Sequence, residues 1–394
     1  MLQIKTLTTV EELAAIADSW DQLLSQSLNN SYSLSWTWLS HWLNVYLGND
    51  RLLCVVVYDD AKLVGIAPLW VKNLRQLGIG RLRVLRFIGS EEVCADHLDF
   101  IISRKNSKAI CAAIWEELHG PLRKQWDIWE YNFVPAMSPV LQSLTELADK
   151  DNRCLSMNIT GFTICPYAVL PDSWETYITS ISRSSRGNLK TSTELLTKAG
   201  NLELRICDSP ESLPGFLETH MDLHRKSWND RGQDGSYTTE TFKRFHRELS
   251  QDLLSRGQLM LCNLELDGVA IGSFYGFIHE KVIYYYLLGV NRAAVPKAGI
   301  GRVLLGKCIE AAIGRKCTEF DMLRGFEEYK YYWTDTERRE LLITFHNRSI
   351  NALVFIFRQF VNRFSKQVGK VLLGGKTKAV KQWLGKGTPD RSSN

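Results

Sequence analysis

The sequence predicts an α/β fold of the α+β kind, with mixed, mostly antiparallel sheets flanked by helices and arranged as two similar halves. Each half begins with helical patterns and continues with a β-hairpin signal. The two hairpins carry glycines at corresponding places, Gly65 and Gly272, about half the chain apart. A layout that recurs at half the chain length indicates a duplicated domain.

Composition narrows the class of protein. The chain has 394 residues, of which 45% are hydrophobic and 23% charged, so we expect a folded protein with two cores. Its net charge of +5 is too small to indicate a DNA partner, and it suits an anionic small molecule. The nine cysteines form no paired motif and no cluster with histidine, so we expect buried thiols in a reducing compartment and no metal site.

The amino terminus lacks the charged and then apolar pattern of a signal peptide. No apolar run approaches the roughly 20 residues that a bilayer span requires. We therefore expect a cytoplasmic protein.

In the first half, apolar periodicity predicts helices over 10–25 and 35–47. Two β-rich runs, 52–58 and 62–71, flank the turn Asp59-Asp60 and predict a hairpin. The other elements expected in this half are strands at 84–89, 97–102 and 128–133 and helices at 107–118 and 137–149. The first half is therefore expected to mix helices and strands.

The second half repeats this order. Helices are expected at 209–228 and 238–255, and a meander of three strands at 258–266, 269–278 and 282–290 follows. The connector between the halves is expected around Pro166 to Asp172, because two prolines and a helix-cap signal lie there.

The most informative stretch runs from Lys281 to Lys330. A strand pattern is followed by Gly299-Ile300-Gly301, an amphipathic helix and a second strand pattern over 318–325. The free amides and the dipole of a helix start favour negative charge, so this stretch predicts a site for a phosphate-bearing ligand, most plausibly a cofactor pyrophosphate. The alternative is a plain tight turn. A dinucleotide-binding Rossmann unit is disfavoured, because it requires parallel βαβ order and usually a third glycine.

Four segments carry a family resemblance: SRSSRGNLK at 182–190, HRKSW at 224–228, YYLLGVN at 285–291 and FDMLRGFEEYKYYW at 320–333. With the order of meander, GxG, helix and strand, they resemble the BioF2-like acyltransferases of the GNAT superfamily, of the cellulose-biosynthesis (CelD and BcsL) type. They are more distantly similar to the FemABX peptidyltransferases. The resemblance implies tandem GNAT-like domains, at 1–168 and 169–368, followed by a basic tail at 369–394.

The resemblance implies acetyl-CoA, or another acyl-CoA, as the acyl donor, bound by the second half. The donor contacts that it implies are Leu288, Gly289, Val290, Lys297, Gly299, Gly301 and Arg302. The chain departs from the family in one respect. The GNAT phosphate loop usually has Gln or Arg three residues before its first glycine, where this chain has Pro296, so Lys297 or Arg302 would substitute.

The implied reaction is direct acyl transfer to an amine or hydroxyl, and it requires a proton acceptor and donors for the oxyanion. No GxSxG motif and no recognisable Cys-His pair indicates a covalent nucleophile. Asp321 and His224 are the leading candidates for the general base. Asp321 could instead cap a strand end or pair with Lys330, and His224 could be a satisfied buried histidine. Further candidates are Glu327, Glu328 and, if substrate binds between the halves, Asp99.

Lys330 is the residue most strongly expected at the reaction centre, because its segment resembles the YK or FK element of the FemABX group. Its alternative is an exposed lysine paired with Glu327. Arg324 and Tyr329 of the same segment are expected to contact the acceptor.

A second acceptor contact is expected on one helix face. Arg183, Arg186 and Lys190 are spaced to share that face and could clamp the phosphate of a nucleotide-linked or lipid-linked sugar. The alternative is a solvated face. The basic tail raises the possibility of weak contact with anionic lipid.

The leading hypothesis is an acyltransferase, an N-acetyltransferase in its simplest form, acting on a small acceptor of envelope or polysaccharide metabolism. Two alternatives stay open. One is a FemABX-like aminoacyltransferase that uses aminoacyl-tRNA, and the other is a non-catalytic scaffold that keeps the fold.

Overall fold

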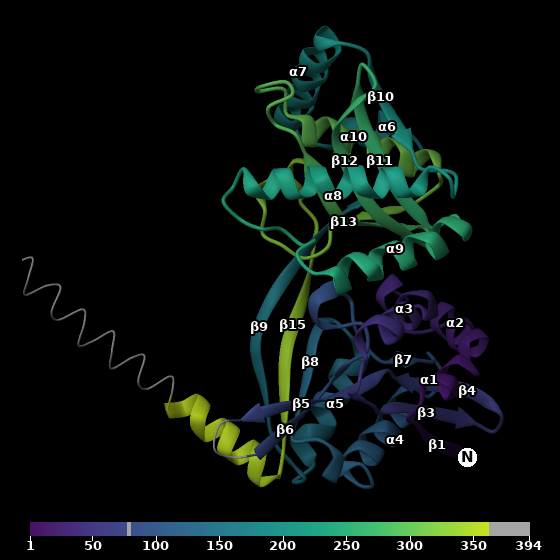
Figure 1. The fold of residues 1–394 in the computed structure, drawn as a ribbon. Coiled ribbons are helices and arrows are strands. Elements are labelled where there is room, and N and C mark those ends of the chain that lie inside the picture. Colours follow the sequence, from purple (N-terminus) through teal and green to yellow (C-terminus); the bar gives the residue numbers. More distant parts are fainter. Residues whose placement is uncertain (77–79, 362–394) are drawn as a thin grey trace, which may run out of the picture.

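The computed structural model describes residues 1–76 and 80–361. Two lobes are stacked on each other and joined by long strands at one side, as Figure 1 shows. The lower lobe is formed by the first part of the chain together with residues after about 337, and the upper lobe by residues from about 170 to about 336. Within the described ranges, no helix is long and apolar enough to cross a membrane.

The lower lobe contains a small antiparallel sheet. Its order is β1 (Leu2–Leu7), β3 (Cys54–Asp59), β4 (Lys62–Ala67) and β7 (Ile101–Ile102). Helices of this lobe are α1 (Val10–Ala14), α2 (Ala17–Ser25), α3 (Trp36–Tyr46), α4 (Ser107–His119) and α5 (Pro139–Lys150). The predicted hairpin is confirmed, because β3 and β4 pair around Asp59 and Lys62.

A second sheet of eleven strands extends through both lobes. Its order is β10-β11-β12-β13-β14-β9-β15-β8-β6-β5-β2. The lower lobe contributes β2 (Arg51–Leu52), β5 (Leu69–Gln76), β6 (Gly80–Phe87) and β8 (Ile128–Pro135). The joining strands are β9 (Cys154–Val169) and β15 (Glu337–Asn347), which pair antiparallel along their length.

The upper lobe holds the predicted meander, formed by β11 (Leu259–Leu266), β12 (Val269–His279) and β13 (Val282–Val290). Strand β10 (Leu202–Ile206) extends it at the edge, and β14 (Glu319–Asp321) pairs in parallel with β13. The helices of this lobe are α6 (Trp174–Ser180), α7 (Arg183–Ala199), α8 (Leu213–Asn229), α9 (Glu240–Ser255) and α10 (Ile300–Gly314). A mixed, mostly antiparallel architecture flanked by helices is thus confirmed.

One core cluster extends across both lobes, and a second lies within the upper lobe. Trp38 on α3 makes edge-on ring contacts with Phe245 of α9 and Phe277 of β12. Tyr32 contacts Tyr284 of β13 with ring centroids 4.6 Å apart. These aromatic side chains are buried. They therefore stabilise the contact between the lobes both through the apolar surface that they bury and through the geometry of their ring contacts.

Several sequence predictions differ from the structure. The helix expected over 10–25 is divided into α1 and α2. The strand expected over 62–71 is divided at Pro68, because proline has no amide to continue the ladder, and its two parts join different sheets. The strands expected at 97–102 and 318–325 are much shorter, and β9 and β15 were not predicted.

The expected connector around Pro166 is not a loop, since β9 continues through it to Val169. The domain limits at 168 and 368 stay a prediction, and the basic tail at 369–394 lies outside the described residues.

Candidate functional site

The candidate site begins where β13 and β14 part. The two strands pair only through Val282, Ile283 and Tyr284. The remainder of β13, from Tyr285 to Val290, pairs with β12 on its other edge, with a bulge that leaves Tyr286 without a partner. The edge of β13 that faces away from β12 is therefore open for backbone hydrogen bonds to a ligand.

A cavity of about 840 Å³ lies against this part of β13. It is lined by β13, by α8, by the start of α10 and by the loops around 231–242 and 322–333. Glu92, Cys94 and Asp96 of the lower lobe complete the wall. A cavity of this volume accommodates a cofactor-sized ligand together with part of a second substrate.

One end of the cavity is built for an anion. Helix α10 has Gly299 as its N-cap in the left-handed conformation, with φ of +60°, and Lys297 also has a positive φ of +67°. A Cβ on Gly299 would lie 2.7 Å from the Ser192 hydroxyl oxygen, so only glycine fits. The first amides of a 15-residue helix thus open into the cavity.

Four basic side chains line the cavity. Lys297 and Arg302 belong to this helix start, whereas Arg231 and Arg292 contact the end of α8 at Trp228 and Ser227. Arg302 donates to Ser192 Oγ at 2.9 Å and lies over the Tyr332 ring, while its buried Nε has no partner among the described residues. An unpaired guanidinium N–H beside a helix start is suited to a phosphate oxygen.

His224 has its ring nitrogens engaged. Nδ1 donates to the Leu288 carbonyl at 3.1 Å, and Nε2 accepts from the Ser236 amide at 3.2 Å. Burial lowers the pKa of His224 to about 4, so the ring is neutral at pH 7. His224 lines the cavity, but both of its ring nitrogens are used to connect α8 with β13 and with the loop after α8. It therefore has no lone pair left to accept a proton from a substrate.

Lys330 is buried rather than solvated, with 3% of its surface exposed. Its ammonium group donates to the carbonyls of Leu323 and Arg324, at 3.1 and 2.7 Å, and pairs with Glu327 at 3.1 Å. All three of its donors are used within one loop. Lys330 therefore shapes the cavity wall over 323–330.

Asp96 is a cavity carboxylate that sequence reasoning missed. It is buried, accepts from the Arg324 amide at 2.9 Å and pairs with the Arg324 guanidinium at 3.0 Å. Burial, together with the negative charge of Glu340, raises the pKa of Asp96 to about 7. This is the pKa range in which a carboxylate works best as a general base near neutral pH.

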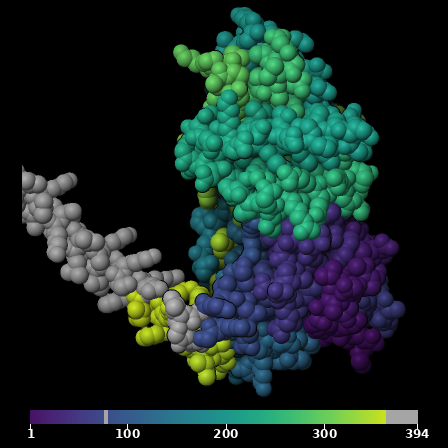
Figure 2. Space-filling view, in the orientation of Figure 1, coloured from purple at the N-terminus to yellow at the C-terminus, as the bar shows by residue number. Residues whose placement is uncertain are grey.

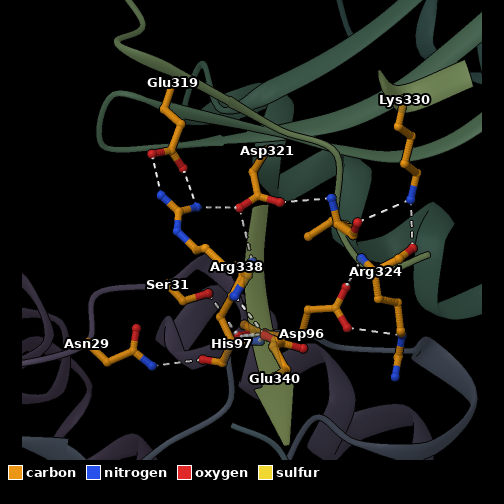
Figure 3. A network of polar contacts seen from close by, with 12 residues as sticks. Asn29, Ser31, Asp96, His97, Glu319, Asp321, Arg324, Lys330, Arg338 and Glu340 are labelled. Atoms are coloured by element: carbon orange, nitrogen blue, oxygen red, sulfur yellow. Dashed lines mark hydrogen bonds and ion pairs between the residues drawn. The ribbon is translucent and has the colours of Figure 1, made fainter. Parts of the chain in front are cut away.

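Asp321 is outside the cavity lining and belongs to a network that Figure 3 shows. Its carboxylate pairs with Arg338 at 2.8 Å and with His97 Nε2 at 3.2 Å. Although burial alone would raise the pKa of Asp321, these two cations lower it. Asp321 does not line the cavity, so it is placed as an ion-pair member and not beside a ligand.

His97 is held between two carboxylates, since its Nδ1 lies 2.7 Å from Glu340 and its Nε2 faces Asp321. Burial alone would lower the pKa of His97, but these charges raise it well above its usual value. Together with Cys165, His97 and Glu340 form a group whose potential ligand atoms lie within 4.8 Å of one another. A cation there would have to displace the existing pairs of the imidazole.

The structure brings most of the predicted donor and acceptor residues into one cavity. The residues that line it are His224, Leu288, Val290, Lys297, Gly299, Gly301, Arg302, Arg324, Tyr329 and Lys330. Gly289 lies just outside, with its Cα against the backbone of α8. Arg183 is exposed on α7, and Arg186 instead donates to the Thr179 and Ile181 carbonyls at the end of α6.

Comparison with known proteins gives a family for the segment that builds the site. Residues 183–331 match the model of the acetyltransferase (GNAT) domain. This part of the chain carries a GNAT-type acetyltransferase domain. It contains α7, α8, β13, α10 and Lys330, and so nearly the whole wall of the cavity.

Solved structures are similar to this one in fold over most of the chain. The structure of FemX is similar with a TM-score of 0.59 and 12% identity, over 86% of this chain and 98% of that one. A conserved protein of unknown function from Bacteroides thetaiotaomicron has a TM-score of 0.50 and 9% identity, over 88% and 100% of the two chains. A tandem GNAT protein from the clavulanic acid biosynthesis pathway has a TM-score of 0.48 and 10% identity, over 89% and 99%. No curated protein sequence matches the chain at a significant level.

These likenesses concern the fold. The GNAT-type domain supplies the helix start and the open strand edge, whereas Asp96 comes from outside it. The lower lobe therefore completes the site.

Proposed function

We propose that the chain transfers an acyl group, acetyl in the simplest case, from acyl-CoA to an amine or hydroxyl of an envelope or polysaccharide precursor. The observation that carries this proposal is the open edge of β13 beside the start of α10, within the GNAT-type domain. A thioester carbonyl can accept from amides of that edge. The diphosphate of the donor would meet the helix start and the side chains of Lys297 and Arg302.

Asp96 is proposed as the general base. The acceptor nitrogen or oxygen attacks the thioester carbon and gives its proton to the Asp96 carboxylate. The tetrahedral oxyanion is held by β13 amides, and the C–S bond then breaks. The CoA leaves as a thiolate with the electron pair of the C–S bond, and the hydroxyl pair Tyr285 and Tyr329, 3.1 Å apart at the cavity wall, can donate a hydrogen bond to that sulfur.

The acceptor would enter between the lobes, since the carboxylates of Glu92 and Asp96 and the guanidinium of Arg324 line that side. A hydroxyl-rich or amino-bearing substrate suits this mixture of charges. The BioF2-like subfamily and the sugar class of the acceptor belong to this proposal and rest on the sequence resemblance.

The first test is ligand binding to the full chain. Acetyl-CoA, a longer acyl-CoA and aminoacyl-tRNA are titrated while the melting temperature is followed, since a ligand that binds only the folded state raises it. We expect stabilisation by an acyl-CoA. Stabilisation by aminoacyl-tRNA alone would favour the FemABX-like alternative, and no response to any of them would favour the scaffold.

A matched pair of variants on α10 locates the donor. Arg302→Ala removes a cation at the helix start, whereas Arg315→Ala removes one at the other end of the same helix, where it donates to the Leu259 carbonyl. Loss of a hydrogen bond to a charged group costs about 1.5–3 kcal/mol, so acyl-CoA affinity should fall roughly tenfold or more for Arg302→Ala. Equal affinities of the two variants would contradict this placement of the donor.

A further inference from the structure

The joining strand β9 has one edge that is largely without a neighbouring strand. Strand β15 occupies one edge of β9, whereas β14 pairs with the other edge only over residues 167–169. Directly below, the carbonyls of Pro166 and Ile164 accept from the amides of Met322 and Gly325, each at 2.9 Å. The outer edge of β9 is therefore covered at its upper end and uncovered further down.

Alternation along the strand gives the backbone groups that face this edge. Since the Ile164 carbonyl points outward, the amide and carbonyl of Phe162, two residues earlier, point outward as well. The register with β15 then shifts at Thr160, so the next outward groups are those of Ile159. Within the described ranges, these outward groups of Phe162 and Ile159 have no hydrogen-bond partner. We name residues 157–162 the β9 edge.

The side chains beside the β9 edge are apolar and exposed. Ile159 and Phe162 are 62% and 57% exposed. They lie opposite Ile343 and Leu341, which are two residues apart on β15, so both belong to one face of the sheet. Phe326, which is 61% exposed, meets the Phe162 ring edge-on with centroids 6.3 Å apart. An apolar row therefore accompanies the free backbone groups.

The sequence of this edge does not protect it. Natural edge strands are commonly blunted by charged side chains or by proline. Accordingly, the edge strand β1 carries Lys5, and the edge strand β10 carries Glu203 and Arg205. Residues 155–163 of β9 read LSMNITGFT, without a charge or a proline, and the irregularity at Thr160 is their protective feature. Such an edge is suited to pairing with another strand.

The shape of the molecule favours a single extended chain as the partner. In Figure 1, β9 is the outermost strand of the waist between the lobes. Figure 2 shows that this side of the waist is set back from the lobe above and the lobe below. An added strand requires only the roughly 4.8 Å spacing of neighbouring strands. Two copies of the folded chain would bring their lobes into contact before their β9 strands could meet.

We propose that the β9 edge binds an extended peptide segment of a partner protein, which adds a strand to the sheet beside β9. The main chain of the peptide would pair with Ile159 and Phe162, and its alternate apolar side chains would contact the row that includes Phe326. The chain's own residues Met322 and Gly325 make the same kind of contact directly above. The proposal does not depend on the acyl-transfer chemistry.

The first test uses a phage-displayed library of random nonapeptides, selected on the full chain. The tightest binders are synthesised with a fluorescent label and titrated. Methylation of alternate backbone nitrogens removes donors from one edge of an extended peptide. We expect one of the two alternating sets of methylations to weaken binding at least about tenfold, and the other set to weaken it less. Hydrogen exchange at residues 157–162 should slow when the peptide is bound.

A matched pair of variants on β9 locates the site. Ile159→Lys places a charge in the apolar row and should lower peptide affinity at least about tenfold. Val169→Lys is the control, because Val169 is 67% exposed on the same strand but lies opposite Glu319 of β14, outside the β9 edge. It should bind like the unmodified chain. Circular dichroism checks that both variants keep the melting temperature of the parent.

Three results would overturn the proposal. The first is that no selected peptide distinguishes Ile159→Lys from Val169→Lys. The second is that neither set of backbone methylations weakens binding, since the peptide would then not pair as a strand. The third is a dimer of the unmodified chain in light scattering that Ile159→Lys dissociates, because the β9 edge would then bind a second copy.

Discussion

At the scale of single residues, the proposed chemistry depends on one carboxylate. Burial and the charge of Glu340 raise the pKa of Asp96 to about 7. A base acts in its deprotonated form, so kcat/KM for acyl transfer should rise with pH through about 7. Asp96→Asn should lower kcat by about 10²–10⁴ and abolish this rising limb, as a pH profile of CoA release would show.

The matched control is Asp99→Asn, three residues further along. Asp99 is also buried, and its pKa is raised to about 6, but Ser138 and Tyr131 donate to it and it does not line the cavity. We expect this variant to lose stability while keeping the shape of the pH profile. If Asp96→Asn retains the limb near pH 7, another group accepts the proton.

At the scale of elements, the site depends on close contact between α8 and β13. A Cβ on Gly289 would lie 2.3 Å from the backbone nitrogen of His224, so α8 can approach β13 only because residue 289 is glycine. Gly289→Ala should destabilise the fold by about 1–3 kcal/mol through overpacking, and it should weaken acyl-CoA binding because the open strand edge moves. Urea unfolding and a binding titration measure the two effects.

Gly215→Ala, on α8 itself, is the control. Nothing lies within 4 Å of the position that its Cβ would take, so we expect unchanged binding and a stability gain of up to about 1 kcal/mol from helix propensity. A Gly289→Ala variant as stable as this control would mean that α8 and β13 are less tightly coupled than their geometry indicates.

The elements that could be predicted from the sequence are those with a local pattern. Alternating apolar residues and the Asp267-Gly268 turn predict the meander, and the segment from 285 to 302 predicts much of the cavity wall. Strand β9 escaped prediction because it is partly exposed on both faces, with Ile159 and Phe162 more than half exposed, so that its apolar pattern is weak. Asp96 escaped because no local pattern distinguishes it, and its role arises from an approach of Arg324, 228 residues away.

At the scale of the whole molecule, the two lobes are joined by charges as well as by the aromatic core. His97 of the lower lobe lies between Asp321, at the end of β14, and Glu340 of the joining strand β15. Figure 3 shows this network together with Asp96 and Arg324. The contacts that hold the lobes together therefore also fix the positions of Asp96 and Arg324, which line the acceptor side of the cavity.

The final prediction concerns this buried histidine. His97→Ala leaves two buried carboxylates without their shared cation, and breaking a buried pair in this way costs about 3–5 kcal/mol. The pKa of His97 is raised in the folded state, so its stabilisation is complete below the usual histidine pKa and is lost as pH rises through the raised value. The difference in unfolding free energy between the parent and His97→Ala should accordingly shrink at alkaline pH.

His41→Ala, which removes a partly exposed pair with Asp252, is the control and should change the free energy of unfolding by less than about 1 kcal/mol at any pH. A difference for His97→Ala that does not vary with pH would indicate that the imidazole acts by packing, and the lobes would then be joined by shape and not by charge.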